Sequence, residues 1–148
     1  MSTGEDVGPE HPVRTRRRRL RYFFYVKHHQ AGRSQHAQWA RDLSREDEFN
    51  VFDVADFHDL SDHKGDLYGV RRLEDGRFAV IGTREEQVAE FPVTPLNQAW
   101  HGYPCWPILR RDDADRKARP PREAVDKMVQ AGILQEKQAS RLKAGRAI

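Results

Sequence analysis

The feature that most constrains the fold is a hairpin signal in the middle of the chain, the stretch DLYGVRRLEDGRFAVIG at residues 66–82. Two runs of β-favouring residues flank Asp75-Gly76, and Asp-Gly tolerates the positive backbone angles that tight hairpin turns require. A third run, QVAEFPV at 87–93, follows; its Pro92 is acceptable only near the edge or the end of a strand. The middle of the chain therefore predicts an antiparallel sheet.

One aromatic strand and one helix complete the predicted sheet domain. The stretch LRYFFYVKH at 20–28 is apolar on both faces, which predicts a central strand covered on each side. Ser34 can cap a helix over 35–46, and a short strand is expected at 49–54. The predicted fold class is α+β, with a small, mainly antiparallel sheet of four to five strands and one packed helix.

The C-terminal residues predict a helical hairpin. Pro121 suits a first helical turn, an apolar stripe follows at helical spacing, and Gly132 supplies a left-handed stop. The stretch 121–145 resembles the short C-terminal helical hairpins of bacterial oligomerisation modules, and this resemblance makes a homo-oligomer one possible assembly. The predicted organisation is a disordered basic arm at 1–19, an α+β domain at 20–111, a charged linker at 112–120 and the hairpin at 121–148.

Charge is distributed in blocks along the chain. Residues 1–21 hold six basic and three acidic residues, and residues 110–148 hold eleven basic and six acidic residues. Residues 22–109 hold nine basic and fourteen acidic residues, a net charge of −5 inside a total of +3. Summed charge steers encounters with partners. The acidic body therefore favours another protein with a basic surface.

Composition narrows the class of protein. With Cys105 as its one cysteine, the chain has no internal disulfide framework. No apolar run approaches the twenty or so residues that span a bilayer, and the charges at the N-terminus precede no signal-peptide stretch. We therefore expect a cytoplasmic protein, bacterial in style, without membrane contact. The common phosphate-loop, nucleophile-elbow and zinc motifs are missing, so no cofactor is expected.

The stretch PLNQAWHGYPCWPI at 95–108 is the main candidate binding surface. His101 titrates near neutrality and Cys105 is a possible nucleophile, but nothing adjacent in sequence orients either group. Two non-catalytic interpretations are rings that fill the core and an aromatic binding loop. The predicted binding residues are Trp100, His101, Tyr103 and Trp106, together with the acidic residues Asp53, Asp56, Asp59 and Asp62.

Those acidic residues lie in the stretch DVADFHDLSDHKGD at 53–66. Carboxylates and imidazoles can hold a divalent metal, and the His58-Asp59 pair resembles one found in metal-dependent phosphohydrolases. A metal site, if present, would use His58, Asp59, Asp62 and His63. Five residues separate the two histidines, which suits one helix face poorly. We predict a solvated acidic loop without metal, which a basic protein can dock against.

The stretch RTRRRRLR at 14–21 can bind phosphates. Clustered arginines release counterions from a nucleic acid and pair with phosphate in bidentate fashion. Arg16, Arg17, Arg18 and Arg19 are the predicted nucleic-acid contacts. The alternatives are a solubilising tail and an arm that folds over the acidic body of its own chain.

A fourth candidate stretch, KHHQAGRSQH at 27–36, permits an enzymatic alternative. His28 and His29 with His101 can act as acid and base, and Arg33 can hold a phosphate, as in a metal-free RNase. The function predicted first is a non-catalytic macromolecule-binding protein of the inhibitor or regulatory adaptor type. The alternatives are an RNase-like phosphodiester-cleaving enzyme and a nucleic-acid-binding protein that uses its basic arm.

Overall fold

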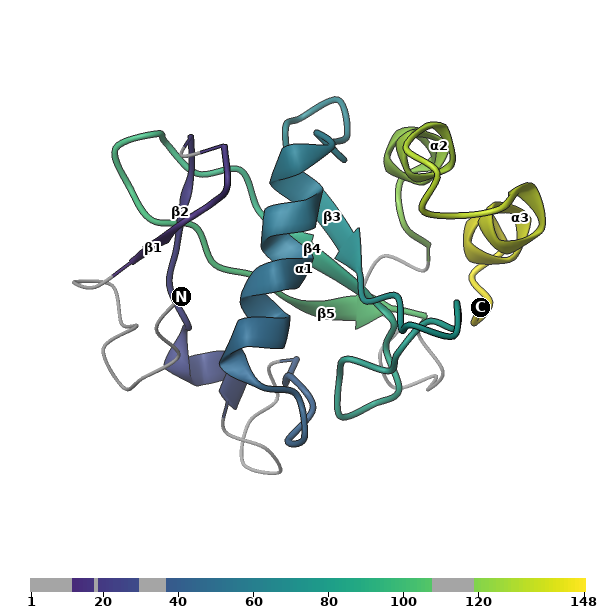
Figure 1. The fold of residues 1–148 in the computed structure, drawn as a ribbon, viewed down its shortest axis with the longest axis horizontal. Helices are drawn as coiled ribbons and strands as arrows, with labels where there is room; N and C mark the ends of the chain where they lie inside the picture. Colours follow the sequence, from purple (N-terminus) through teal and green to yellow (C-terminus); the bar gives the residue numbers. More distant parts are fainter. Residues whose placement is uncertain (1–11, 18, 30–36, 108–118) are drawn as a thin grey trace.

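The computed structural model describes residues 12–17, 19–29, 37–107 and 119–148 and has the predicted α+β class. Its five strands form two antiparallel sheets, β1-β2 and β3-β4-β5, rather than one sheet of four to five strands. In Figure 1, α1 lies across the three-stranded sheet, with the β1-β2 ribbon on one side and α2 and α3 on the other. The elements are β1 (Val13–Arg14), β2 (Arg21–Tyr22), the 3₁₀ helix η1 (Val26–His29), α1 (Arg45–Phe57), β3 (Leu67–Val70), β4 (Val88–Phe91), β5 (Tyr103–Trp106), α2 (Arg122–Gln130) and α3 (Glu136–Lys143).

Helix α1 occupies the stretch 49–54 that predicted a strand, so that prediction is wrong. The Ser44 hydroxyl accepts a hydrogen bond from the backbone N–H of Asp47 at 3.0 Å and caps the helix. Acidic residues fill the first turn, where the helix dipole favours negative charge. Phe49 and Phe52 are three residues apart and both buried, a helical spacing that the run of apolar residues concealed.

The helix predicted over 35–46 is wrong over residues 37–44, and of its described residues only the last two, Arg45 and Glu46, are helical, as the start of α1. Trp39 forms an isolated antiparallel bridge with Gly82. The backbone N–H of Ala40 donates to the carbonyl oxygen of Ile81 at 2.8 Å. Residues 38–40 therefore pair with the backbone of residues 81–83, because long-range backbone pairing overrides the local helical pattern.

The turn predicted at Asp75-Gly76 is confirmed. The backbone N–H of Leu73 donates to the carbonyl of Arg77 at 2.7 Å, which closes the turn. The far side of the turn, however, pairs with Arg71 and Arg72, just beyond the end of β3, through one isolated bridge and one hydrogen bond from the Ala79 N–H. Strand β3 itself pairs with β4, in an unbroken antiparallel register of four residue pairs. The later run at 87–93 thus forms the centre of the sheet.

A glycine in β3 allows α1 to pack closely on this sheet. A Cβ added at Gly69 would lie 2.7 Å from the carbonyl oxygen of Val51 in α1. That distance is shorter than any side chain permits, so only glycine fits at this contact. The helix consequently approaches the sheet backbone directly.

The aromatic stretch 20–28 forms β2 and η1 rather than a long central strand. Tyr22 pairs with Val13 of β1 and also forms a parallel bridge with Trp100. The backbone N–H of Phe23 donates to the carbonyl of Trp100 at 2.9 Å. The described part of the arm, expected to be disordered, therefore pairs with β2 in a short ribbon.

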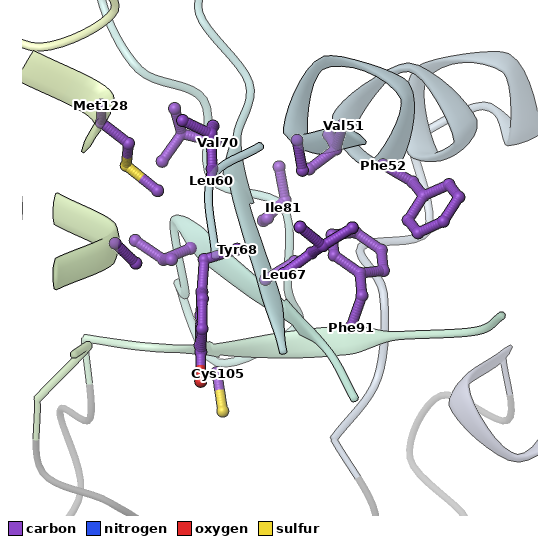
Figure 2. Packing of buried hydrophobic residues seen from close by; sticks show 14 of the residues in the cluster. Val51, Phe52, Leu60, Leu67, Tyr68, Val70, Ile81, Phe91, Cys105 and Met128 are labelled. Atoms are coloured by element: carbon purple, nitrogen blue, oxygen red, sulfur yellow. The ribbon is translucent and has the colours of Figure 1, made fainter. Parts of the chain in front are cut away.

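The hydrophobic core lies between α1 and the three-stranded sheet and extends to α2. The Tyr22 ring lies 4.9 Å from that of Phe52, and the Phe52 ring lies 5.0 Å from that of Phe91. Figure 2 shows Phe52 and Phe91 on the α1 side of the core, with Met128 of α2 reaching toward Val70 from the other side. Rings dominate this core because each buries a large apolar area.

Helices α2 and α3 form the predicted C-terminal hairpin. Pro121 is the residue that precedes α2, and Gly132 has the left-handed backbone angle expected of it, φ +76°. The side chain of Gln87 hydrogen bonds both the backbone N–H and the carbonyl oxygen of Ile148 at 2.9 Å. These contacts join the end of the chain to the sheet. Most of the predicted linker, residues 112–118, lies outside the described residues.

Candidate functional site

Five rings gather where the chain leaves β2 and where it enters β5. The ring centroids of Tyr25 and His101 are 4.8 Å apart, and those of His28 and Tyr103 are 5.1 Å apart. His28 and His101 stack with their planes 17° apart, and Phe23 packs against His101 at 5.3 Å. All except His28 are partly exposed. We call these five residues the ring patch.

His101 adds no positive charge to the ring patch at neutral pH. Burial lowers the pKa of His101 from its ordinary value, so the imidazole is neutral at pH 7. The Nδ1 atom of His28 lies 2.8 Å from the carbonyl oxygen of Ala37. A carbonyl oxygen accepts only, so Nδ1 carries the proton and Nε2 keeps a lone pair in the neutral ring.

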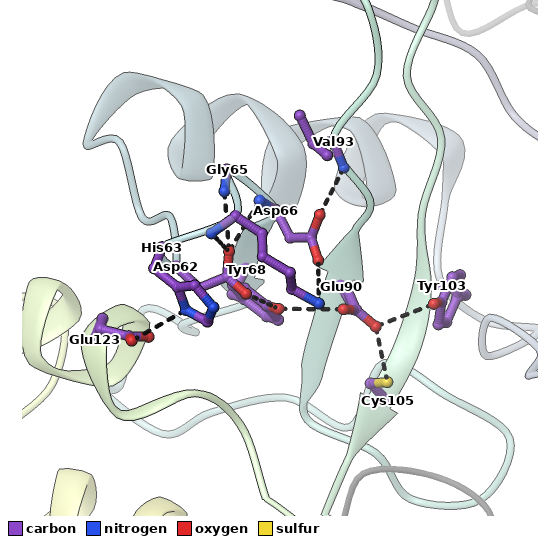
Figure 3. A network of polar contacts seen from close by, with 11 residues as sticks. Asp62, His63, Gly65, Asp66, Tyr68, Glu90, Val93, Tyr103, Cys105 and Glu123 are labelled. Atoms are coloured by element: carbon purple, nitrogen blue, oxygen red, sulfur yellow. Dashed lines mark hydrogen bonds and ion pairs between the residues drawn. The ribbon is translucent and has the colours of Figure 1, made fainter.

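A buried carboxylate supports the patch from behind. Glu90 of β4 is 6% exposed, and one of its oxygens accepts hydrogen bonds from the Tyr103 hydroxyl at 3.0 Å and from the Cys105 thiol at 3.7 Å. Its other oxygen accepts from the Tyr68 hydroxyl at 3.1 Å. The hydrogen bond from Tyr103 fixes one ring of the patch to the centre of the sheet (Figure 3).

Tyr68 joins Glu90 to a second buried carboxylate. Its hydroxyl also lies 2.9 Å from Asp62 Oδ2, while Asp62 Oδ1 accepts from the backbone N–H groups of the turn at 64–66. A phenol has one proton, so Tyr68 donates to one carboxylate at a time. Asp66 completes the group and accepts from the backbone N–H of Val93 at 2.8 Å. We call these residues the carboxylate network: Asp62, Asp66, Tyr68, Glu90, Tyr103 and Cys105.

Burial and charge set the protonation of this network. Burial raises the pKa of Tyr68, and the negative charge of Glu90 raises it further. Burial and Glu90 act in the same way on the pKa of Tyr103. For Asp62, burial works upward, but hydrogen bonds from Tyr68 and from two backbone N–H groups lower the pKa overall. Both phenols are therefore proton donors, and Asp62 is ionised at neutral pH.

The sequence reasoning did not find Glu90 or Tyr68. A usable signal was present, because Glu90 is the one charged residue between the apolar residues Val88 and Phe91 of a predicted strand. A charged group at the centre of a buried strand needs partners, since burial without hydrogen bonds is strongly unfavourable. That argument predicts a polar network, although it does not predict which phenols supply the donors.

The second polar group lies on α1, where three arginines of the arm bind one end of the helix. Arg16 donates through its backbone N–H and its Nε to the two oxygens of Asp53, at 2.6 and 2.5 Å. Arg19 donates twice to Asp56 Oδ1, from Nη2 at 2.6 Å and from Nε at 3.0 Å. Arg17 Nη1 donates to the carbonyl oxygen of Asp56 at 2.9 Å. We call this group the arginine clasp.

Two of the predicted binding residues and three of the predicted nucleic-acid contacts lie in the clasp, where they pair with each other. Asp53 and Asp56 are buried beneath arginines of their own chain, which is the arrangement of an arm folded over its acidic body. Arg18 lies outside the described residues. The other predicted acidic residues are separated, because Asp59 is exposed after the end of α1 and Asp62 is buried in the carboxylate network.

The tryptophans predicted as binding residues belong to the core. Trp106 is 0% exposed and packs against Tyr68 at 5.7 Å, so its ring does not reach the surface. Trp100 is 4% exposed and packs against Phe52 at 5.8 Å. Of the aromatic stretch, His101 and Tyr103 alone retain partial exposure among the four predicted residues. The core-filling interpretation therefore describes the two indoles.

A surface pocket of about 350 Å³ lies beside the clasp. Arg19 lines it together with Asp59, and Trp100 contributes to its wall. The indole N–H of Trp100 is buried and has no hydrogen-bond partner within the described part of the chain. The exposed side chain of Leu96, with 72% of its surface accessible, also lines the pocket.

The residues proposed for metal binding or catalysis are only partly brought together. His63 pairs with Glu123 at 3.3 Å, and His58 packs on the ring of Phe57. In the described ranges, no group of three or more His, Cys, Asp or Glu is placed to hold a metal ion. His29 pairs with buried Glu48 at 3.0 Å instead of joining His28 and His101. Arg33 lies outside the described residues.

Comparisons with known proteins leave the site to be interpreted from its own geometry. No protein-family model matches the chain, and neither curated proteins nor solved structures include one that is similar. Among the residues that the structure describes, no helix combines the length and apolarity required to cross a membrane. The ring patch and the arginine clasp are the two groups of side chains from which a function can be inferred.

Proposed function

We propose that the protein is a non-catalytic binding protein that recognises another protein through basic side chains of that partner, as an inhibitor or a regulatory adaptor does. The ring patch is the observation that carries this proposal. It offers Tyr25, His101 and Tyr103 as adjacent, partly exposed rings whose faces attract guanidinium and ammonium groups. Aromatic residues of this kind supply much of the binding energy at protein interfaces.

The charges around the patch favour a cationic partner over a phosphate. Neutral His101 adds no positive charge, and the carboxylate of Glu90 lies directly behind Tyr103. The segment that builds the body, residues 22–109, has a net charge of −5. A polyanion approaching this face meets repulsion, whereas a basic protein is attracted and steered to it.

The test uses the full chain and two labelled probes, an arginine-rich peptide and a single-stranded oligonucleotide, titrated by fluorescence anisotropy. The Tyr25→Ala, His101→Ala double variant is expected to weaken peptide binding at least about tenfold, the effect of losing one hot spot. His63→Ala is the matched control, because His63 is exposed and lies outside the patch. Peptide binding that is unchanged in the double variant contradicts the proposal, as does preferential binding of the oligonucleotide.

The RNase-like alternative is retained because of one observation, the stacking of His28 on His101 at 6.1 Å. Two imidazoles at this separation can act as base and acid on one phosphodiester. Incubation with RNA and with DNA, each with and without a divalent metal, distinguishes the two functions. Cleavage that is lost in His101→Ala and retained in His63→Ala would establish the enzyme, and the absence of cleavage would favour the binding protein.

A further inference from the structure

In the arginine clasp, the end of α1 makes three kinds of contact with the arginines of one short segment of the arm. Asp53 accepts from the backbone and the guanidinium of Arg16, whose guanidinium also lies 4.3 Å from the ring centroid of Phe57. The carbonyl oxygens of Asp56 and Phe57, at the negative end of α1, accept from Arg17 at 2.9 and 3.4 Å. This end of the helix thus binds guanidinium groups by charge, by hydrogen bonding and by stacking.

One contact in the clasp is incomplete. Asp56 is 0% exposed, yet both hydrogen bonds from Arg19 go to Oδ1, and Oδ2 has no hydrogen-bond partner among the described residues. A guanidinium group frequently binds a carboxylate through both of its oxygens. Arg19 is tethered, because the backbone N–H of Thr15 donates to the carbonyl of Leu20 at 3.0 Å and closes a tight loop around it. A buried acceptor is therefore left for a better-placed arginine.

The arm that fills the site is accessible to solvent. The side chains of Arg16 and Arg19 are 55% and 42% exposed, whereas those of Asp53 and Asp56 beneath them are at most 5% exposed. A cation that reaches solvent is screened by salt and is open to competition from other guanidinium groups. Arg19 also lines the neighbouring pocket, so its departure would join that pocket to Asp56.

We propose that this end of α1 is a recognition site for an arginine-rich segment of the partner protein, and that the chain's own arm competes for it in cis. Charge complementarity and the seated arm identify the occupant as a run of arginines. The inference rests on the proposed function in one respect, that the partner is basic, but it concerns other residues than those of the ring patch. The arm then sets the affinity for the partner, because the site is available only while the arm is displaced.

The experiment compares the wild-type full chain with an arm-neutral variant, Arg16→Gln, Arg17→Gln, Arg19→Gln. The probe is a fluorescein-labelled peptide with the sequence of residues 14–21, RTRRRRLR. The arm-neutral variant is expected to bind the peptide at least about tenfold tighter than the wild type, because the internal competitor is removed. Adding Asp53→Asn and Asp56→Asn should abolish that gain. Adding Glu74→Gln and Glu136→Gln, two exposed carboxylates elsewhere, should preserve most of it.

A second measurement does not depend on how the aspartate variants fold. A peptide in which every arginine is replaced by lysine has the same charge but lacks the planar fork that a carboxylate binds. We expect it to bind the arm-neutral variant at least about fivefold more weakly than the arginine peptide. Equal binding of the two peptides would reduce the site to general charge attraction and would overturn the inference.

Three other results would also overturn the inference. Equal binding of the peptide by the wild type and the arm-neutral variant would show that the arm does not compete. A dimer of the wild type that dissociates in the arm-neutral variant would make the occupant the arm of a second copy. An oligonucleotide that binds the wild type more tightly than the variant would make the arm a nucleic-acid element. Adding Tyr25→Ala and His101→Ala to the arm-neutral variant should leave the gain intact, which separates this test from that of the ring patch.

Discussion

The carboxylates of the sheet and those of α1 are both buried, but different partners satisfy them. Glu90 and Asp62 accept hydrogen bonds from phenols, a thiol and backbone N–H groups that belong to the sheet and its adjoining turn. Asp53 and Asp56 are bound by guanidinium groups that come from 37 positions earlier in the chain. The first group is internal to the core, and the second joins the core to an exposed arm.

This difference separates a structural group from an exchangeable one. Neutral donors inside a core are fixed by packing, and their hydrogen bonds respond weakly to salt. Exposed guanidinium groups are screened by salt and can be replaced by other guanidinium groups. The carboxylate network therefore holds Tyr103 and the ring patch in place, whereas the arginine clasp is suited to exchange with a partner.

The largest effect is expected from Tyr68→Phe, which removes one hydroxyl from the carboxylate network. The hydroxyl that Asp62 and Glu90 share is then missing, and one buried carboxylate is left without its donor, which should reduce the free energy of unfolding by about 3 kcal/mol. Urea unfolding measures this change. Tyr103→Phe is the graded control and should lose about 1 kcal/mol, because the Tyr103 hydroxyl donates to one carboxylate, Glu90, and the residue is partly exposed. Equal, small losses of unfolding free energy in both variants would show that Tyr68 has no special role in stability.

The next effect tests the salt dependence of the clasp. Arg19→Gln should reduce the free energy of unfolding by about 1 to 2 kcal/mol at low salt, because buried Asp56 loses its charged donor. In 1 M NaCl the difference from the wild type should fall to roughly half or less, since salt screens the wild-type ion pair. The loss in Tyr68→Phe should be the same at both salt concentrations.

A matched arginine control is available on the surface. Arg77 is 79% exposed and pairs with exposed Asp75, so Arg77→Gln should change the free energy of unfolding by less than about 0.5 kcal/mol. If Arg19→Gln behaves like Arg77→Gln at low salt, the clasp contributes no more than an ordinary surface pair. If its loss does not depend on salt, the clasp belongs with the carboxylate network, and the contrast between the two regions disappears.

Elements specified by local chemistry could be predicted from the sequence. The turn at Asp75-Gly76 and the stop at Gly132 depend on backbone angles that few residues adopt, and both were predicted correctly. Helix α1 was missed, although Ser44 and the acidic first turn are local signals for it. The closely spaced aromatic residues and valines of α1 are also typical of a strand. The helical period has to be compared with strand alternation to distinguish the two.

Long-range pairing could not be predicted in the same way. Trp39 lies in a segment of helical pattern but pairs with Gly82, and no local feature identifies that partner. From the sequence, the basic arm can bind phosphate, serve as a solubilising tail or fold over the acidic body of its own chain. Only the fold shows that Arg16 and Arg19 reach Asp53 and Asp56 on one face of a helix. The ring patch likewise combines His28 with His101 across a long separation in sequence.

The smallest effect is expected from Asp62→Asn, and it concerns pH. Because its hydrogen bonds lower the pKa of Asp62 in the folded state, this group stabilises the fold above the unfolded pKa, about 4. That stabilisation is lost as the pH falls below about 4 toward the lower folded pKa. At pH 7 the variant should remain within about 1 kcal/mol of the wild type, since an amide N–H can donate to Tyr68 while Tyr68 donates to Glu90.

Urea unfolding at several pH values between 2 and 7 measures this effect. The wild type should lose stability more steeply than Asp62→Asn below about pH 4, because the amide does not titrate. Asp59→Asn is the control for the substitution itself, since Asp59 is exposed and lies outside the network. If Asp62→Asn also follows the wild type, Asp62 carries no pH-dependent stabilisation. The acid sensitivity of the fold would then lie with other carboxylates, and salt would be the better means of separating the two regions.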